Sequence, residues 1–295
     1  MKASFGVEDA KALSAAPTHA PVDYLLHLAD NALILGQRNA EWCGHGPVLE
    51  EDLALANHAL DHLGQARLLY QHAAALINAD PTLAERFAHL PGARANGAIT
   101  EDTLAYFRSS REFLNFTLLE LPHHGPLAGP ARQDRDYATT IVRNFLYAAL
   151  MRLWWDALQG SADAQLAGIA AKSLKEVRYH LQHAGDWLVR LGDGTPESHA
   201  RAQAALDHLM PYTQEFWTGS GTEAEAAADD IGVALSTLKP AWDALVDEAL
   251  AEATLKRSSA VGHVPQGKHG QHSEHMGFLL AEMQSLAREH PQAVW

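Results

Sequence analysis

A histidine-rich stretch near the carboxyl end of the chain has the composition of a metal site. Residues 268–277, KHGQHSEHMG, contain histidines at intervals of three, namely His269, His272 and His275. Imidazole nitrogens and carboxylates such as that of Glu274 are common zinc ligands. Gly270, however, predicts a loop that ends at Ser273, a good helix N-cap, with Glu274 at the positive end of the helix dipole. The spacing alone leaves two readings open, a zinc site and a role in hydrogen bonding or packing.

A di-iron centre is the second kind of chemistry that the residue types suggest. Helical bundles build such centres from one Glu on each of two helices and a Glu-x-x-His pair on each of two more. The only Glu-x-x-His in the chain joins Glu120 to His123, and Pro122 between them predicts that the helix has ended. Glu176 and His180 have the i, i+4 spacing of either two metal ligands or an ordinary helix-stabilising pair. The sequence therefore offers a poor set of iron ligands.

Cysteine chemistry is restricted to one residue. Cys43 is the only cysteine, which excludes an intrachain disulfide and any multi-cysteine zinc or iron–sulfur site. His45 lies two residues away, but the sequence identifies no third group that would orient it as a base. We expect a packed, unreactive cysteine in a reducing compartment.

Composition and charge narrow the class of protein. The 295 residues are 47% hydrophobic, enough for a buried core, and the net charge is −14, from 22 Lys and Arg against 36 Asp and Glu. No basic block would track a phosphate backbone, which argues against nucleic acid as a partner. No apolar run approaches the roughly 18 residues of a membrane span. Residues 1–20 lack the pattern of a secretory signal, so we expect a flexible tail there, one domain over residues 21–295, and a cytoplasmic protein.

Helical periodicity dominates the domain. One apolar stripe consists of Leu25, Leu28, Ala32 and Leu35. A second consists of Leu53, Ala56, Leu60, Leu63 and Arg67. We expect both helices to bury these stripes against their neighbours. Further helices are predicted at residues 101–121, 139–159, 165–192, 197–217, 238–255 and 273–289.

The segments between these helices are the predicted loops. We expect loops at residues 78–100, 122–136, 218–231 and 257–272. The small, acidic segment 218–231 is expected to be mobile. No strict apolar–polar alternation predicts a strand. The predicted fold class is all-α, a bundle of long helices.

Three long stretches resemble one known family. They are EWCGHGPVLEEDLALANHALDHLGQAR (41–67), SLKEVRYHLQHAGDWLVRLGDGT (173–195) and GKHGQHSEHMGFLLAEMQSLAREHPQAVW (267–295). They resemble the C subunits of the ring 1,2-phenylacetyl-CoA epoxidases, multicomponent bacterial oxygenases of aerobic phenylacetate degradation. The resemblance covers about residues 22–295. It implies a ferritin-like long-helix bundle with additional C-terminal helices.

The resemblance also implies a partner. In this family a homologous A subunit holds the di-iron centre and epoxidises the aromatic ring of phenylacetyl-CoA, using O2 and electrons from a separate reductase. The C subunit is its non-catalytic, structural partner. We therefore expect a hetero-oligomer with two copies of each subunit, contacts with other epoxidase subunits and the reductase, and a contact with phenylacetyl-CoA.

The iron ligands of the A subunit can be carried over to this sequence. One Glu-x-x-His falls on His62 and Gln65, between Asp61 and Gly64, and the other on Val177 and His180. The two remaining carboxylates fall near Ala32 and Tyr147. Since only one of the six ligands survives, the resemblance implies that this chain holds no metal and that the di-iron centre belongs to the A subunit. We expect packing and hydrogen bonds to fill the vacated interior, with a neutral His180 paired to a neighbour.

Two further groups of residues follow from the resemblance. The family signature at Lys268, His272, Glu274 and His275 is expected to fix a loop or to meet the A subunit. An Arg-x-Phe-x-Asn pattern at Arg111, Phe113 and Asn115 is associated with the coenzyme A part of the substrate, or with an ordinary amphipathic helix. Trp154, Trp155 and Trp217 are candidates for an interface or for the core.

Two other functions stay open from the sequence. The chain could be a metalloenzyme in its own right, an oxidoreductase that uses Glu176, His180, Glu120 or the C-terminal histidines. It could also be a bundle for general interaction or storage, without an oxygenase partner.

Overall fold

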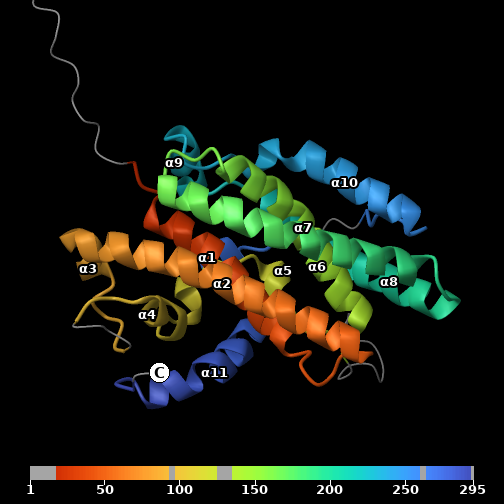
Figure 1. Cartoon of the computed structure of the whole chain (residues 1–295), viewed down its shortest axis with the longest axis horizontal. Helices are drawn as coiled ribbons and strands as arrows, with labels where there is room; N and C mark the ends of the chain where they lie inside the picture. Colours follow the sequence, from red (N-terminus) through yellow and green to blue (C-terminus); the bar gives the residue numbers. More distant parts are fainter. Residues whose placement is uncertain (1–17, 93–96, 125–134, 260–263, 294–295) are drawn as a thin grey trace, which may run out of the picture.

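Four long helices form the centre of the molecule. The computed structural model describes residues 18–92, 97–124, 135–259 and 264–293. The long helices are α1 (Val22–Ala40), α2 (Leu49–Ala79), α6 (Tyr137–Leu158) and α7 (Ala164–Gly192). α1 packs mainly against α2, and α6 against α7, so that two helical hairpins lie side by side (Figure 1). The described part of the chain contains isolated bridges, such as that between Gln266 and Gln271, but no β-strand, which confirms the all-α prediction.

Short helices cover the bundle on two sides. Between α2 and α6 the chain forms α3 (Pro81–Arg86), α4 (Glu101–Tyr106), the 3-10 helix η1 (Ser110–Glu112) and α5 (Thr117–Glu120). After α7 it forms α8 (Pro196–Leu209), η3 (Met210–Trp217), α9 (Gly221–Ala228), η4 (Leu235–Thr237), α10 (Lys239–Glu252), η5 (Gly267–His269) and α11 (Glu274–Glu289). α8 and α10 pack on α6 and α7, whereas α11 packs on α4, η1 and α5 (Figure 1).

The prediction of a single helix over residues 101–121 is wrong. The structure breaks it into α4, η1 and α5, because buried side chains of α1 take backbone donors that a helix would need. Leu114 N–H donates to Asp30 Oδ2 at 2.7 Å, and Phe116 N–H donates to Asn31 Oδ1 at 2.8 Å. Side-chain acceptors that replace helical carbonyls satisfy the backbone equally well and let the chain run extended.

Other predicted boundaries also change. The helix predicted at residues 197–217 turns into the 3-10 helix η3 after Leu209, beside Pro211. The segment 218–231, predicted to be a mobile loop, contains α9, whose start is a capping box between Ser220 and Glu223. The predicted loop 78–100 likewise contains α3. Parts of the other predicted loops, residues 125–134 and 260–263, lie outside the described residues.

The two apolar stripes behave in opposite ways. The α1 stripe is buried as predicted, with Leu25 and Leu28 fully inaccessible. Most of the α2 stripe points outward instead. Leu53 is 55% and Leu60 is 64% exposed, whereas Leu63 is half-buried against the core. The face of α2 that packs into the bundle carries polar side chains, including His58, His62 and Gln65. Trp154 and Trp155 are core residues, and Trp217 packs partly buried against the core.

The ends of the predicted domain are only partly described. Of the predicted tail, residues 1–17 lie outside the described residues, and Ala20 is already buried. Most of the buried hydrophobic side chains form one cluster that runs from Ala20 to Leu280. In the described part of the chain, no helix is both long enough and apolar enough to cross a membrane.

Candidate functional site

The positions that correspond to iron ligands lie inside the four-helix centre. They are Ala32 on α1, His62 and Gln65 on α2, Tyr147 on α6, and Val177 and His180 on α7, and all six are buried. The ring centroids of His62 and His180 are 4.8 Å apart, and those of His62 and Tyr147 are 6.3 Å apart. The two long hairpins therefore bring His62, Tyr147 and His180 close together.

This arrangement does not fit a di-iron centre. His180 Nε2 lies 2.9 Å from Asp61 Oδ2, and the amide of Gln65 donates to Glu176 Oε2 at 2.9 Å. Glu176 and His180 thus each bind a residue of α2. No three ligand atoms of His, Cys, Asp or Glu at these positions lie within 4.8 Å of one another among the described residues. Val177 and Ala32 have no donor atom to offer an iron.

A group of imidazoles fills the space instead. It consists of His58, His62, His180 and His183, with centroid distances of 4.3 Å between His58 and His180 and 4.7 Å between His58 and His183. Burial, with smaller electrostatic contributions from the neighbouring imidazoles, lowers the pKa of His58 to about 2. Burial also holds the pKa of His62 well below its usual value, with a further lowering from His180. The rings of His58 and His62 are therefore neutral. We call His58, His62, His180 and His183 the histidine cluster.

Sequence reasoning missed two members of the histidine cluster. His58 precedes His62 by one helical turn, and His183 follows His180 by three residues. These two spacings on facing helices were the signal that could have revealed it. His183 Nε2 lies 2.8 Å from Glu51 Oε2. Within the histidine cluster, four buried ring nitrogens have no hydrogen-bond partner in the described structure, namely His58 Nε2, His62 Nδ1, His180 Nδ1 and His183 Nδ1.

The C-terminal signature fixes a loop against α5 and η3. Lys268 Nζ lies 2.9 Å from both carboxylate oxygens of Glu223, and its backbone N–H donates to Glu215 Oε1 at 2.9 Å. Burial raises the pKa of Glu215 even though these donors favour its charge. Gly270 has φ +73°, and a Cβ there would lie 2.3 Å from Arg111 O, so this position requires glycine.

His272 links the same loop to the core. Its Nδ1 lies 2.6 Å from Glu120 Oε2, and its Nε2 donates to Phe113 O at 2.9 Å. Glu120 also accepts from Ser273 N–H at 2.5 Å. Burial opposes a charge on His272, but its hydrogen bond to Glu120 and the charge of Glu120 raise its pKa above the usual value. These contacts hold Lys268 and His272 in place, and a contact of the signature with the A subunit stays a prediction.

The two metal hypotheses based on these residues do not match the geometry. Glu120 binds His272, whereas His123 Nε2 lies 3.2 Å from Glu41 Oε2 and its Nδ1 lies 2.7 Å from Thr140 Oγ1. The histidines of residues 268–277 also point to different places. His269 and Glu274 are exposed, and His275 instead lies near His124, with ring centroids 6.2 Å apart.

We expect Glu120→Gln to lower the free energy of unfolding by about 1.5–3 kcal/mol, since hydrogen bonds to a charged, buried group contribute that much. The matched control is Glu112→Gln. Glu112 Oε1 lies 2.7 Å from His89 Nε2, but this pair is partly exposed, so its loss should cost under about 1 kcal/mol. Urea denaturation of both variants measures the difference. Equal losses would show that the buried hydrogen bonds of Glu120 contribute no more to stability than the exposed pair of Glu112 does.

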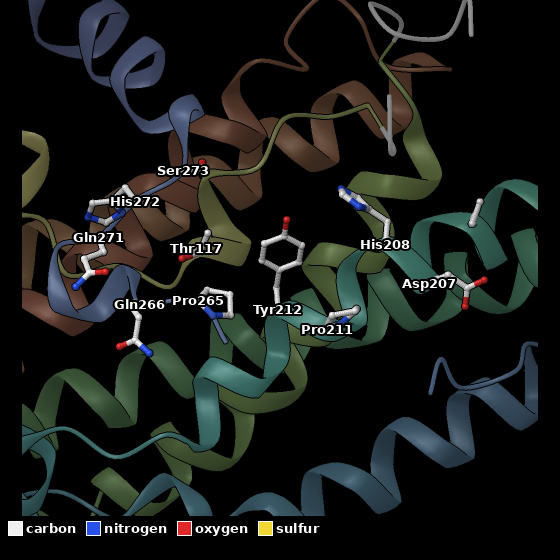
Figure 2. Close-up of a pocket in the computed structure, with 11 residues that line it drawn as sticks. Thr117, Asp207, His208, Pro211, Tyr212, Pro265, Gln266, Gln271, His272 and Ser273 are labelled. Atoms are coloured by element: carbon white, nitrogen blue, oxygen red, sulfur yellow. The ribbon is translucent and has the colours of Figure 1, made fainter. Parts of the chain in front are cut away.

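A pocket opens beside this loop. Its volume is about 870 Å³, and Figure 2 shows Tyr212 in it between His208 and the loop that carries His272. The lining consists of Thr117, Ala204, Asp207, His208, Pro211, Tyr212, Pro265, Gln266, Gln271, His272 and Ser273. Burial lowers the pKa of His208, with further lowering from His124 and His275. The pocket has the size of small-molecule sites and a mixed polar and apolar wall.

The predicted coenzyme A residues lie outside that lining. Phe113 and Asn115 are fully buried, and only Arg111 is exposed. The amide of Asn115 donates to Glu120 Oε2 at 3.0 Å. A contact between these three residues and coenzyme A stays a prediction, and Arg111 is the member that a ligand can reach.

Cys43 differs from its prediction. The side chain is exposed, so the expectation of a packed cysteine is wrong. It lies in the turn between α1 and α2, where Gly44 N–H and Gly46 N–H both donate to Asp52 Oδ2. Asp52 holds this turn together, and the thiol takes no part in it.

Comparisons with known proteins agree with the fold and with the sequence resemblance. The family model described as phenylacetic acid catabolic protein matches residues 1–295. The C subunit of the 1,2-phenylacetyl-CoA epoxidase of Escherichia coli (strain K12) is 39% identical over 272 residues, which cover 92% of this chain and 98% of that protein. The four-helix centre is accordingly ferritin-like. The chain belongs to the family of phenylacetic acid catabolic proteins.

Proposed function

We propose that the chain is the C subunit of a phenylacetyl-CoA epoxidase, a non-catalytic subunit that supports a di-iron A subunit in phenylacetate catabolism. The name of the E. coli relative supports this function. The site supports it as well, because the positions to which the resemblance carries the iron ligands hold Ala32, Val177 and the neutral imidazole of His62. In this proposal the di-iron centre and the oxygen chemistry belong to the A subunit.

The single observation that carries the subunit role is the outward stripe of α2. Leu53 and Leu60 are seven residues apart, and Leu49 and Ala56 repeat the same interval. The three leucines are 55–71% exposed. We call these four residues the α2 seam. An apolar heptad repeat on a solvent-facing helix costs solubility unless another helix covers it.

The α2 seam fits a helix of the A subunit. Alternating intervals of three and four residues let the side chains of a second helix pack between those of α2. Interfaces of permanent complexes resemble a core cut in half, with apolar centres of this kind. The proposal includes two copies of each subunit, cytoplasmic assembly and contacts with the reductase, as the family resemblance implies.

We expect the double variant Leu53→Glu/Leu60→Glu to lose binding to the A subunit by at least about 100-fold, because buried uncompensated charges cost several kcal/mol. Both side chains are exposed in the isolated chain, so its fold should tolerate the change. Co-elution and calorimetric titration with the A subunit measure the effect.

Leu286→Glu is the matched control for these charges. Leu286 lies on α11 and is 55% exposed, as much as Leu53, but lies outside the α2 seam. The control should bind the A subunit as the native chain does. Undiminished binding by the seam variant would refute the assignment of this interface. Absence of any complex with the native chain would instead favour a bundle without an oxygenase partner.

The alternative of an independent metal-dependent oxidoreductase has less support. Glu176 and Asp61 already bind Gln65 and His180, and Glu120 binds His272. None of these groups is arranged around a common point with two others in the described part of the chain.

A further inference from the structure

Three potential metal ligands meet at the end of the bundle where the chain enters α1. His19 lies in the segment before α1, His72 near the end of α2, and Asp163 directly before α7. One ligand atom from each of the three lies within 4.8 Å of the other two. In the described part of the chain, this is the only such group of three or more His, Cys, Asp or Glu residues. It is distinct from the histidine cluster, which lies elsewhere on α2 and α7.

Two of these groups are held rigidly by the fold. Asp163 Oδ1 accepts the N–H groups of Gln165 and Leu166, which fixes the carboxylate as the cap of α7. Its Oδ2 accepts Ala20 N–H at 2.8 Å and lies 2.7 Å from His72 Nε2. Both side chains are buried, Asp163 to 1% exposure. The carboxylate and this imidazole are therefore positioned before any ligand arrives.

His19 completes the group from the solvent side. Its ring meets that of His72 edge to face, with the centroids 6.2 Å apart. His19 is exposed and lines an open pocket beside Pro21 and Asp23, so an ion and its water can reach the group. Ligand atoms of a tetrahedral zinc ion lie about 3.3 Å apart, since each bond is about 2.0–2.1 Å long. A rotation of the exposed His19 side chain and a small separation of His72 from Asp163 would reach this geometry.

We propose that His19, His72 Nε2 and Asp163 Oδ2 bind one divalent ion of the zinc type, with water as the fourth ligand. Two imidazoles and one carboxylate form a donor set that zinc prefers. Binding of the ion through His72 Nε2 requires the neutral tautomer of this ring that carries its hydrogen on Nδ1. The ion ties the segment before α1 to α2 and α7, so its role is structural. This inference is independent of the proposed oxygenase function.

Titration of the full-length, chelator-treated chain with Co²⁺ tests the proposal. We expect one Co²⁺ per chain with the visible absorption of a tetrahedral site, displaced by Zn²⁺, and a zinc-dependent rise in the unfolding temperature. His19→Ala should weaken zinc binding at least about tenfold, because even the loss of an outer partner of a ligand costs that much. Since His19 is exposed, the metal-free variant should unfold at the same temperature as the native chain.

Two controls separate this site from other histidines. His45→Ala removes an exposed imidazole in the turn after α1, and His180→Asn removes one from the histidine cluster. Both should bind Zn²⁺ with native affinity. The proposal is overturned if the native chain binds no Zn²⁺ at about 100 μM, or if His19→Ala binds it as well as the native chain does. Neither result would touch the proposed subunit role, which is measured by binding to the A subunit.

Discussion

Asp30→Asn should lower the free energy of unfolding of this chain by about 3–5 kcal/mol, because it leaves a buried cation without its counter-charge. Asp30 and Arg108 form an ion pair with both side chains fully inaccessible. Asp30 Oδ1 also accepts from Tyr70 Oη at 2.5 Å, and its Oδ2 accepts from Leu114 N–H. Although burial opposes a charge on Arg108, the charge of Asp30 raises its pKa above the usual value. Urea denaturation gives the loss directly.

The control and the double variant show whether the charge is the cause. Asp23 lies on α1, as Asp30 does, and Asp23→Asn breaks a partly exposed ion pair with Arg86 of α3, which should cost under about 1 kcal/mol. Asp30→Asn/Arg108→Met removes both buried charges and should unfold less easily than Asp30→Asn alone, since no unpaired charge remains. Equal losses for the single and double variants would mean that lost hydrogen bonds, and not the charge, dominate.

The second large effect is a loss of stability in mild acid. In the unfolded chain, histidines take up protons below a pH of about 6.5. In the fold, His58 and His62 stay neutral, because burial lowers the pKa of His58 to about 2 and that of His62 well below its usual value. The unfolded state therefore binds more protons, and stability falls as the pH falls below about 6.5. His58 alone contributes about 2 kcal/mol between pH 6.5 and 4.5, and His62 adds to the loss in the same direction.

Other histidines also contribute to the pH dependence of stability over this range. Burial also lowers the pKa of His123 to about 4, which adds to the loss. His272 has a raised pKa, so its contribution is complete below about pH 6.5 and disappears only at higher pH. Urea midpoints measured from pH 7.5 to 4.5 should be much less dependent on pH in His58→Gln/His62→Gln. The same slope in the double variant would assign the acid sensitivity to other groups.

The sequence predicted the long helices well, because their apolar spacing depends on local geometry. Leu25 and Leu28 were placed correctly on the buried face of α1. The same reasoning put Leu53 and Leu60 in the core, whereas the structure exposes them. Periodicity identifies an apolar face but not the surface that covers it, which in an assembly can belong to another chain. Likewise, no local signal could show that Asp30 and Asn31 interrupt a helix about 80 residues later.

For the candidate site, types of residue were easier to predict than their partners. His180 was expected to pair with a neighbour, and the structure supplies Asp61 at 2.9 Å. That pair joins residues 119 positions apart, so only packing of α2 on α7 reveals it. His58 and His183 match no position of the iron-ligand pattern, so the sequence did not single them out. The group of His19, His72 and Asp163 shows no pattern in the sequence either, since three separate elements supply it and only the fold brings them together.

Turnover of phenylacetyl-CoA tests the central claim most directly. Product formation should be measured with the reductase and reductant for this chain alone, for the A subunit alone, and for the two together. We expect no turnover by this chain alone, full turnover by the pair, and loss of that gain with Leu53→Glu/Leu60→Glu. The variant His180→Asn should support turnover as the native chain does. Turnover by this chain without the A subunit, abolished by His180→Asn, would contradict the account and place the reaction in the histidine cluster.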